Sequence, residues 1–221
     1  MSRTPNIIIN CGEPSGIGLD LCVFLAFKKF PALITVMANQ EALKARAKMH
    51  GKKINFTKKQ RPHIGDGSIF LINVPYKDKV TPGSPSPRNS LTQIKMIDYA
   101  VVNCINTNYD ALVTLPISKE TLSTVNTKFT GHTEYISNLC DTKNKEVMLL
   151  ANKKLKVALV TTHVPVSEIS SLITKIKLIN VIKTLHNDLK KRFKIKNPKI
   201  IITGLNPHAG ENGNFGDEEL R

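Results

Sequence analysis

The sequence has no tryptophan, few other aromatic residues and no hydrophobic run long enough to cross a membrane. Its longest apolar run, from Leu21 to Phe27, is far shorter than the roughly 20 residues that a transmembrane helix needs. Residues 1–10 also lack the cationic start, long apolar stretch and small-residue cleavage site of a secretory signal. We therefore expect a chain that stays in the cytoplasm and has no membrane partner.

Cysteine is sparse, and its spacing argues against both disulfides and thiolate zinc sites. Cys11, Cys22, Cys104 and Cys140 are widely separated, and none belongs to a C-x-x-C pair. In a reducing compartment such residues are expected to be buried thiols. With 41% hydrophobic and 22% charged residues, the composition is that of a globular chain, and the few aromatics predict a mainly aliphatic core.

Acidic residues are also scarce, since 17 Asp and Glu face 32 Lys and Arg and leave a formal charge of +15. A basic chain can serve a nucleic acid, an acidic membrane or an anionic substrate. The lysines are spread along nearly the whole chain rather than clustered, and no zinc-finger spacing or aromatic-rich recognition motif accompanies them. We favour solvated surface lysines and no nucleic-acid partner; a nucleic-acid-binding protein remains an alternative that rests on charge alone.

Short apolar runs alternate with helix-length segments, a pattern typical of an α/β fold with a mainly parallel sheet flanked by helices. The clearest loop is Thr81 to Arg88, where three prolines prevent a helix or strand from continuing. The predicted strands are Ile7–Ile9, Leu33–Met37, Ile69–Val74, Ala111–Leu115, Val147–Leu150, Val157–Thr161 and Lys199–Ile202. The predicted helices are Ile17–Lys29, Gln40–His50, Ser90–Ile105, Lys119–Val125, Thr133–Leu139 and Lys175–Arg192.

The end of the sequence reads as the beginning of another helix. Residues 216–221 place acidic side chains where a helix dipole favours them, and then the sequence stops. A single helical turn is not stable by itself. We therefore expect a C-terminally truncated chain.

A glycine-rich segment, Cys11–Gly18, follows the first predicted strand and precedes a helix. Glycines at such a turn let the backbone approach a ligand, and the helix N-terminus offers free N–H groups to an anion. The spacing matches neither G-x-G-x-x-G nor the P-loop. From these residues alone, a ligand loop and a turn that merely packs helix on sheet are equally favoured.

Two further polar segments begin predicted helices. In Thr130–Glu134, His132 and Thr133 can hydrogen-bond a polar substrate, although a helix-capping Thr133 and an exposed loop histidine are the commoner outcome. Lys119 follows the strand Ala111–Leu115 and can face an acidic ligand, although an exposed lysine at a helix start is more common.

Two histidines follow predicted strands at their C-terminal ends, where α/β sheets bind ligands. His163 follows Val157–Thr161, and His208 follows Lys199–Ile202. Two neutral imidazoles that meet there would suit a divalent metal, although a catalytic site normally takes three protein ligands. The sequence therefore predicts that His132, His163 and His208 gather beyond the ends of strands.

Four motifs taken together resemble the 4-hydroxythreonine-4-phosphate dehydrogenase family of vitamin B6 biosynthesis. They occur in the family's order and spacing, and they cover essentially the whole chain, which corresponds to the N-terminal two-thirds of a family member. The motifs are GEPSGIG at 12–18, GHTE at 131–134, TTHVP at 161–165 and GLNPHAGENG at 204–213.

The resemblance implies a fold like that of isocitrate and isopropylmalate dehydrogenases and a homodimer. It implies oxidation of 4-phosphohydroxy-L-threonine to 2-amino-3-oxo-4-phosphooxybutanoate, with decarboxylation to 3-amino-2-oxopropyl phosphate, in pyridoxal phosphate biosynthesis. The cofactors would be NAD or NADP and a divalent zinc, magnesium or cobalt ion. We expect residues 1–128 to form an α/β domain on the cofactor side, and residues 129–221 to form part of a second, truncated α/β domain on the metal and substrate side.

By motif, the resemblance makes His163 and His208 metal ligands and His132 and Thr133 substrate contacts. Gly12, Gly16 and Gly18 correspond to a glycine turn near the cofactor, and no catalytic acid or base is assigned.

The sequence also departs from the family, because Asn10–Cys11 stands where the family usually has Thr-Pro, and a third metal histidine and the phosphate-binding residues are missing. Two alternatives therefore stay open: an inactive remnant of the dehydrogenase, and an α/β enzyme resembling phosphate acyltransferases.

Overall fold

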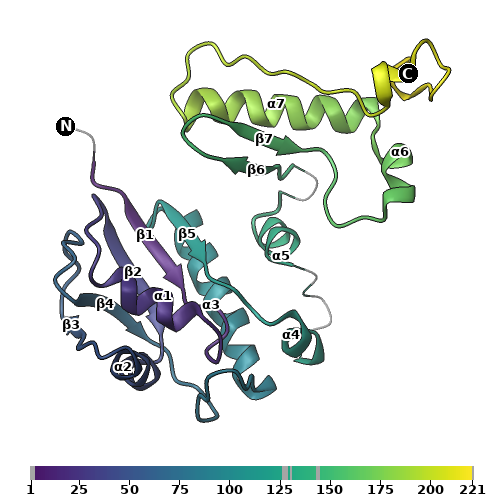
Figure 1. The fold of residues 1–221 in the computed structure, drawn as a ribbon. Helices are drawn as coiled ribbons and strands as arrows, with labels where there is room; N and C mark the ends of the chain where they lie inside the picture. Colours follow the sequence, from purple (N-terminus) through teal and green to yellow (C-terminus); the bar gives the residue numbers. More distant parts are fainter. Residues whose placement is uncertain (1–2, 126–128, 130, 143–144, 221) are drawn as a thin grey trace. The chain divides into compact units, whose positions relative to one another are not determined.

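The computed structural model of the chain describes residues 3–125, 129, 131–142 and 145–220. The chain divides into two compact units, Met1–Asp141 and Thr142–Arg221 (Figure 1). The domain boundary expected after residue 128 falls at a position outside the described residues. Within the described ranges, no helix is long and apolar enough to cross a membrane.

The first unit is built on a five-stranded sheet in which every pair of neighbours is parallel. The strand order is β3-β4-β2-β1-β5, so the first strand of the chain lies inside the sheet, between β2 and β5. This confirms the predicted α/β fold with a mainly parallel sheet. The strands are β1 (Asn6–Asn10), β2 (Leu33–Ala38), β3 (Asn55–Thr57), β4 (Ser68–Asn73) and β5 (Ala111–Thr114).

Helices cover both faces of this sheet. The connections through α1 and α2 move toward the β3 edge, whereas the connection through α3 returns to β5, and right-handed crossovers place such helices on opposite faces (Figure 1). Two short helices, α4 and α5, follow β5. The helices are α1 (Gly18–Leu25), α2 (Gln40–Met49), α3 (Pro87–Ile105), α4 (Lys119–Val125) and α5 (His132–Leu139).

Two apolar clusters hold the first unit together. The larger one packs the sheet against α1, α2 and α3, and most of its fully buried members are aliphatic, such as Ile8, Val36 and Leu19. The smaller one packs α4 and α5 against α3 through Ile97 and Leu122. The mostly buried strands β1 and β2 read as continuous apolar runs, which is why the sequence located them, whereas β3 was not predicted.

The cysteines are all free thiols. Cys11 and Cys22 are fully buried, which confirms the expectation for these two, but Cys104 and Cys140 are only partly buried.

The second unit contains an antiparallel pair of strands, β6 (Met148–Ala151) and β7 (Lys156–Leu159), and a long helix, α7 (Lys175–Lys191). The side chain of Asn152 makes the turn between the strands by accepting hydrogen bonds from the backbone N–H groups of Lys154 and Leu155, both 2.8 Å long. The remaining elements are α6 (Ile169–Leu172) and three short 3-10 segments, Val166–Glu168, Pro207–Gly210 and Glu218–Leu220.

The strand predicted at Lys199–Ile202 is wrong, since this segment belongs to no strand in the structure. Ile201 and Ile202 are 89% and 60% exposed. An apolar run becomes a strand only when a neighbouring strand pairs with its backbone groups, and the described residues provide no such neighbour.

Candidate active site

The glycine turn between β1 and α1 needs its glycines for its own folding. Gly12 has a left-handed φ of 71°, and a Cβ atom there would lie 2.2 Å from the carbonyl oxygen of Pro116. A Cβ atom on Gly18 would lie 1.8 Å from the carbonyl oxygen of Cys11. A Cβ atom on Gly16 would lie 3.3 Å from the carbonyl oxygen of Glu13. The turn is thus packed tightly against itself and against the segment that follows β5. This geometry is expected if the glycines serve to pack the helix on the sheet. Cofactor binding by these glycines stays a prediction.

A buried carboxylate locks the turn from within. The carboxylate of Glu13, which is 6% exposed, accepts hydrogen bonds from the backbone N–H of Ser15 at 3.1 Å and from its hydroxyl at 2.8 Å. Its other oxygen accepts from Nε2 of the fully buried Gln93 on α3, at 2.7 Å. Glu13 therefore fixes the turn and is itself fully engaged.

A buried arginine holds the same turn from the α2 side. Arg46 donates to the carbonyl oxygens of Gly16 at 3.2 Å and Pro14 at 3.3 Å, and it pairs with Asp20 on α1 at 2.5 Å. The second oxygen of Asp20 lies 2.6 Å from Nε2 of His50. Sequence reasoning missed Arg46; the available signal was its position between Leu43 and Ala47, on the buried face of α2.

The turn also joins the segment that follows β5. The backbone N–H of Glu13 donates to the carbonyl oxygen of Pro116 at 2.9 Å. The chain continues through Ile117, which packs against the smaller apolar cluster, to Lys119 at the first residue of α4. The carboxyl ends of β1 and β5, adjacent parallel strands, therefore bring the glycine turn and the Lys119 segment to one edge of the sheet.

His132 begins α5 and keeps an unused polar atom. Its ring lies edge-on to Phe129, with centroids 5.8 Å apart, and its Nε2 atom is buried without a hydrogen-bond partner among the described residues. Burial lowers the pKa of His132 below its ordinary value, and the positive charge of Lys119 lowers it further. The imidazole is therefore neutral near pH 7, with one ring nitrogen available to a ligand.

The start of α5 differs from the alternative in which Thr133 caps the helix and His132 is an exposed loop residue. Gly131 is the N-cap, so the alternative in which Thr133 caps the helix is wrong; Thr133 lies inside α5 and is half-buried. His132 is likewise part of the helix and partly buried rather than an exposed loop residue. The helix is anchored to α3 by Tyr135, whose hydroxyl donates to Asp98 at 2.7 Å.

The other two histidines lie in irregular backbone of the second unit. His163 follows β7, His208 lies in the 3-10 segment Pro207–Gly210, and both are exposed with left-handed φ values of 55° and 49°. In the part of the chain that the structure describes, no three His, Cys, Asp or Glu side chains could together hold a metal ion. A catalytic metal site takes three protein ligands, so these two histidines do not make one by themselves. The gathering of all three histidines stays a prediction.

Glu219 organises the loop that carries His208. It accepts hydrogen bonds from the backbone N–H groups of Leu205 at 2.8 Å and Asn206 at 2.7 Å, and from the Asn206 side chain at 2.9 Å. The bonds from Asn206 hold the pKa of Glu219 below its ordinary value.

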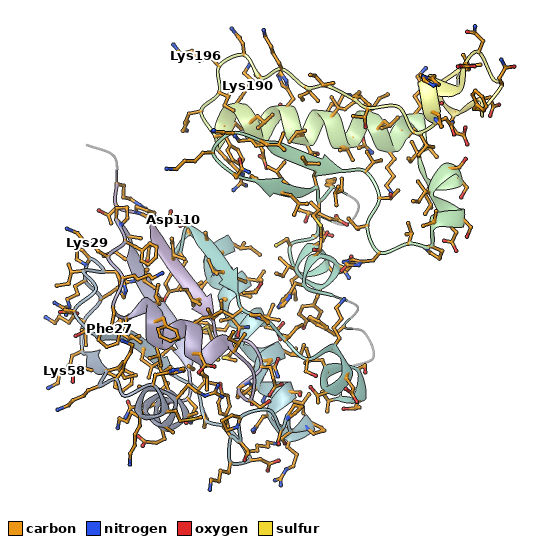
Figure 2. All side chains as sticks on the ribbon, in the orientation of Figure 1. Phe27, Lys29, Lys58, Asp110, Lys190 and Lys196 are labelled. Atoms are coloured by element: carbon orange, nitrogen blue, oxygen red, sulfur yellow. The ribbon has the colours of Figure 1, made fainter. Side chains whose placement is uncertain are left out.

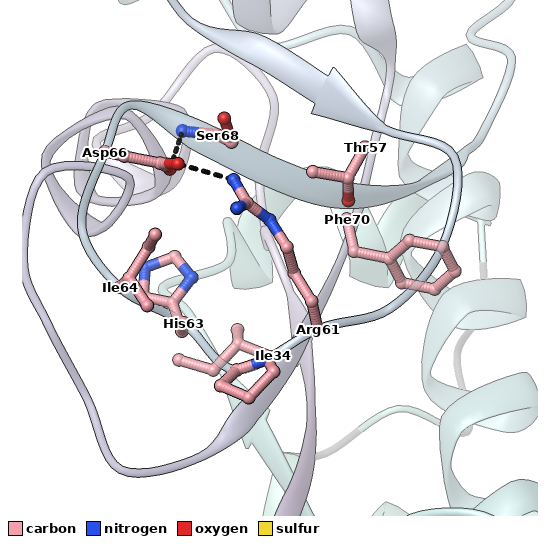
Figure 3. A pocket seen from close by; sticks show the side chains of 9 residues that line it. Ile34, Thr57, Arg61, His63, Ile64, Asp66, Ser68 and Phe70 are labelled. Carbon is pink, nitrogen blue, oxygen red and sulfur yellow. Dashed lines mark hydrogen bonds and ion pairs between the residues drawn. The ribbon is translucent and has the colours of Figure 1, made fainter.

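A small recess beside β2 and β4 contains none of the predicted site residues. Figure 3 shows Arg61 reaching toward Asp66, at 2.5 Å, while Asp66 also accepts the backbone N–H of Ser68. Nε2 of His63 lies 2.9 Å from the carbonyl oxygen of Leu25. These charged groups are satisfied by one another and by the backbone.

The excess of lysine lies on the surface of both units. Figure 2 shows Lys29 and Lys58 of the first unit, and Lys190 and Lys196 of the second, pointing outward. This arrangement is typical of solvated lysines.

Comparison with known proteins gives a consistent family. The model of the family described as pyridoxal phosphate biosynthetic protein PdxA matches residues 30–221. A 4-hydroxythreonine-4-phosphate dehydrogenase from Methylococcus capsulatus is 38% identical over 98% of this chain and 66% of that protein. A protein of the same name from Neisseria meningitidis serogroup A is 37% identical over 98% of this chain and 67% of its own length.

Solved structures agree with the sequence matches. A crystal structure of 4-hydroxythreonine-4-phosphate dehydrogenase from Klebsiella pneumoniae superposes with a TM-score of 0.85 at 25% identity, over 100% of this chain and 68% of that one. The corresponding structure from Burkholderia phymatum gives 0.83 at 26% identity, over 100% and 68%.

The chain spans about two thirds of the length of these relatives. The resemblance expected from the four motifs is thereby confirmed, and the chain belongs to the PdxA family of pyridoxal phosphate biosynthetic proteins.

Proposed function

We propose that this chain acts in pyridoxal phosphate biosynthesis as an NAD-dependent dehydrogenase of 4-phosphohydroxy-L-threonine. The product would be 2-amino-3-oxo-4-phosphooxybutanoate, which loses CO2 to give 3-amino-2-oxopropyl phosphate. Family membership supports the reaction class, since the matching relatives carry the name 4-hydroxythreonine-4-phosphate dehydrogenase. The structural observation that carries the proposal is the buried, unpartnered Nε2 of His132 at the start of α5.

The substrate contacts in this proposal are His132 and Thr133. A neutral imidazole can donate or accept one hydrogen bond through Nε2, which suits a substrate hydroxyl that becomes a carbonyl. Leaving that buried nitrogen unpaired costs free energy, and a ligand oxygen would remove the cost. The burial that lowers the pKa of His132 keeps the ring in this neutral form.

The cofactor would lie beside the turn that contains Gly12, Gly16 and Gly18. NAD, or NADP, would accept the hydride from the carbon that carries the hydroxyl, while the hydroxyl proton goes to solvent or to a base. The chain's own contribution is rigidity, because Glu13 and Arg46 together fix the turn from two sides. A rigid turn holds a cofactor at small entropic cost.

The metal part of the proposal concerns His163 and His208 as two ligands of a divalent zinc, magnesium or cobalt ion. A bound ion would act as a Lewis acid on the substrate oxygen. The described residues do not complete this site, so metal binding needs its own measurement. A homodimer and a cytoplasmic location also remain proposals.

The test is reduction of NAD by the purified chain with 4-phosphohydroxy-L-threonine, in the presence of each divalent ion in turn. We expect NADH formation, and we expect His132→Asn to abolish most of it while the fold is retained by circular dichroism. Binding of substrate without NADH formation would support the inactive remnant instead. Absence of both binding and turnover would overturn the proposal, and acyl transfer to phosphate would support the acyltransferase alternative.

A further inference from the structure

We propose that the first unit carries a docking surface for an anionic lipid bilayer, at the amino ends of β1 and β2. Three segments form this surface: residues 24–30 at the end of α1, residues 49–53 at the end of α2, and residues 63–67 before β4. The expectation of no membrane partner rested on the lack of a long apolar run, and contact with one leaflet needs none. The inference does not rest on the proposed dehydrogenase activity.

Exposed apolar side chains gather on the three segments. Phe24 lies on α1, Phe27 and Phe30 follow it at intervals of three residues, and the three rings are 39–42% exposed. Met49 at the end of α2 is 65% exposed, and Ile64 before β4 is 49% exposed. Apolar side chains that are exposed singly are common, so their meaning depends on whether these five are neighbours.

The first two segments contact each other through Lys52 and His50. The ammonium of Lys52 lies 4.5 Å from the ring centroid of Phe27 and 5.9 Å from that of Phe24. The ring centroid of His50, which follows Met49, lies 4.8 Å from that of Phe24. The exposed side chains at the ends of α1 and α2 therefore lie side by side.

Backbone hydrogen bonds attach the third segment to the first. The N–H of Phe30 donates to the carbonyl oxygen of His63 at 3.1 Å, and the N–H of Gly67 donates to that of Ala26 at 2.9 Å. Ile64 follows His63 directly, so it lies next to the turn that carries Phe30. The five apolar side chains thus form one surface, and a contiguous exposed apolar surface marks an interaction site.

Four lysines accompany these apolar side chains. The three segments contain a single carboxylate, that of Asp66, and it pairs with Arg61 at 2.5 Å. The surface therefore combines exposed apolar groups with positive charges that the protein leaves uncompensated. Within the described ranges, no acidic side chain pairs with the four lysines, which are Lys28, Lys29, Lys52 and Lys53.

This combination is complementary to an anionic bilayer. Apolar side chains enter the boundary between headgroups and acyl chains, while lysine stems lie along it and their ammonium groups stay among the headgroups. The cytoplasmic leaflet of a membrane carries negative charge, which attracts lysines that lie close together. The glycine turn follows β1 at the opposite edge of the sheet, so a bound bilayer would not cover it.

Two other occupants fit this surface less well. The bases of a single-stranded nucleic acid stack on open ring faces, whereas Lys52 lies over the rings of Phe24 and Phe27, and Met49 and Ile64 have no ring. A second copy of this chain brings the same positive charges, and the formal charge of +15 opposes that contact. An anionic lipid surface meets neither obstacle.

A single tryptophan can report the contact, because the chain has none of its own. Phe24→Trp places it on the surface. Phe193→Trp, in the second unit, is the matched control: Phe193 is 43% exposed, against 42% for Phe24, and the ammonium of Lys156 lies 5.6 Å from its ring centroid. Each variant is mixed with phosphatidylcholine vesicles with and without about 30% phosphatidylserine, and in parallel with vesicles whose acyl chains are brominated.

We expect the emission of Phe24→Trp to shift to shorter wavelength, and to be quenched by brominated acyl chains, only when phosphatidylserine is present. Phe193→Trp should show neither change. Equal changes in the two variants would overturn the inference, because the contact would then not lie on this surface. Thermal unfolding of each variant checks that the fold is retained.

Vesicle sedimentation measures the contribution of the lysines in the chain without tryptophan. Lys28→Gln combined with Lys29→Gln should weaken binding to phosphatidylserine vesicles about 10- to 30-fold. Lys190→Gln combined with Lys191→Gln, an equal change of charge on exposed residues of α7, should stay within about twofold of the wild type.

The same assay measures the apolar contribution. Met49→Gln should weaken binding about threefold or more, because less apolar area enters the bilayer. Val166→Gln is its control, since Val166 is 85% exposed but lies in the second unit.

Absence of sedimentation with phosphatidylserine vesicles, or equal weakening by the two pairs of lysine substitutions, would overturn the inference. Binding of an oligouridine in place of the vesicles would overturn it as well, and would assign the surface to a nucleic acid.

Discussion

Arg46 on α2 and Asp20 on α1 form an ion pair of 2.5 Å whose side chains are only 7% and 15% exposed. The same guanidinium also holds two carbonyl oxygens of the glycine turn, those of Pro14 and Gly16. One side chain thus joins two helices to the loop between β1 and α1, and the loop is rigid because of it.

Replacing Arg46 should therefore be costly. Arg46→Ala leaves the largely buried carboxylate of Asp20 with His50 alone and two carbonyl oxygens without the guanidinium, and we expect a loss of about 3 kcal/mol or more in the free energy of unfolding. Arg61→Ala is the matched control, since its pair with Asp66 is 44% and 40% exposed and should contribute about 0–1 kcal/mol. Urea unfolding followed by circular dichroism measures both, and equal losses would contradict the clamp.

The contact between Glu13 and Gln93 can be isolated by a double-mutant cycle. We expect Glu13→Ala to cost about 3 kcal/mol, because it leaves buried N–H groups of Ser15 and Gln93 unpaired. The coupling between Glu13→Ala and Gln93→Ala should be about 1–2 kcal/mol. Additive losses in urea unfolding would show that the 2.7 Å hydrogen bond does not contribute.

Gly12 and Gly51 separate backbone strain from crowding. Both have left-handed φ values, 71° and 61°, but a Cβ atom on Gly51 would meet nothing within 4 Å, whereas one on Gly12 would clash with backbone. We expect Gly51→Ala to cost about 1 kcal/mol from strain alone, and Gly12→Ala to cost at least about 2 kcal/mol more. Thermal unfolding measures the loss of stability in each variant. A larger loss in Gly51→Ala than in Gly12→Ala would mean that the segment after β5 can move away from the added Cβ atom.

The lowered pKa of His132 predicts a dependence of stability on pH. Because the folded state disfavours the protonated ring, its contribution is fully present above the ordinary histidine pKa of about 6.5 and is lost as pH falls through the lower folded value. His132→Gln should remove this part of the pH dependence of unfolding. Lys119→Met should raise the pKa of His132 in an NMR titration; an unchanged pKa would mean that burial alone determines it.

Metal binding is tested directly by titration with Co²⁺ or Zn²⁺. If His163 and His208 are ligands, replacing either by alanine should weaken binding by more than the roughly 10- to 100-fold that loss of an outer-shell partner costs. His186→Ala, on α7, is the control. Affinities that are equal in all four proteins would exclude these two residues as ligands.

Much of the first unit could be predicted because its central strands, β1 and β2, are mostly buried and appear as local apolar runs. The short edge strand β3 is not apolar and was missed. The error at Lys199–Ile202 has the same origin, since an apolar run does not show whether a partner strand exists. The antiparallel pairing of β6 and β7 depends on the turn at Asn152, whose side chain caps the backbone. Asn152 indicates this turn in the sequence, but the spacing of apolar residues takes no account of it.

The candidate site likewise contains residues that local motifs reveal and residues that only the folded structure reveals. The glycine turn and His132 carry recognisable local motifs, and both could be located from sequence. Arg46 and Gln93 hold that turn from 30 and 80 residues away along the chain, and contacts at such separations leave no local pattern. The burial that leaves Nε2 of His132 unpaired is likewise a property of the packed structure.

The inner position of β1 has a consequence for synthesis of the chain. Its partner β5 ends at Thr114, and Asp110 just before β5 binds both Arg3 and the backbone of Asn6. During translation the backbone N–H and C=O groups along the β1 edge that pairs with β5 must therefore remain unpaired until more than a hundred residues have left the ribosome. Such late closure is slow and exposes apolar surface, so in living cells the yield of folded protein should depend on chaperones that shield the nascent N-terminus.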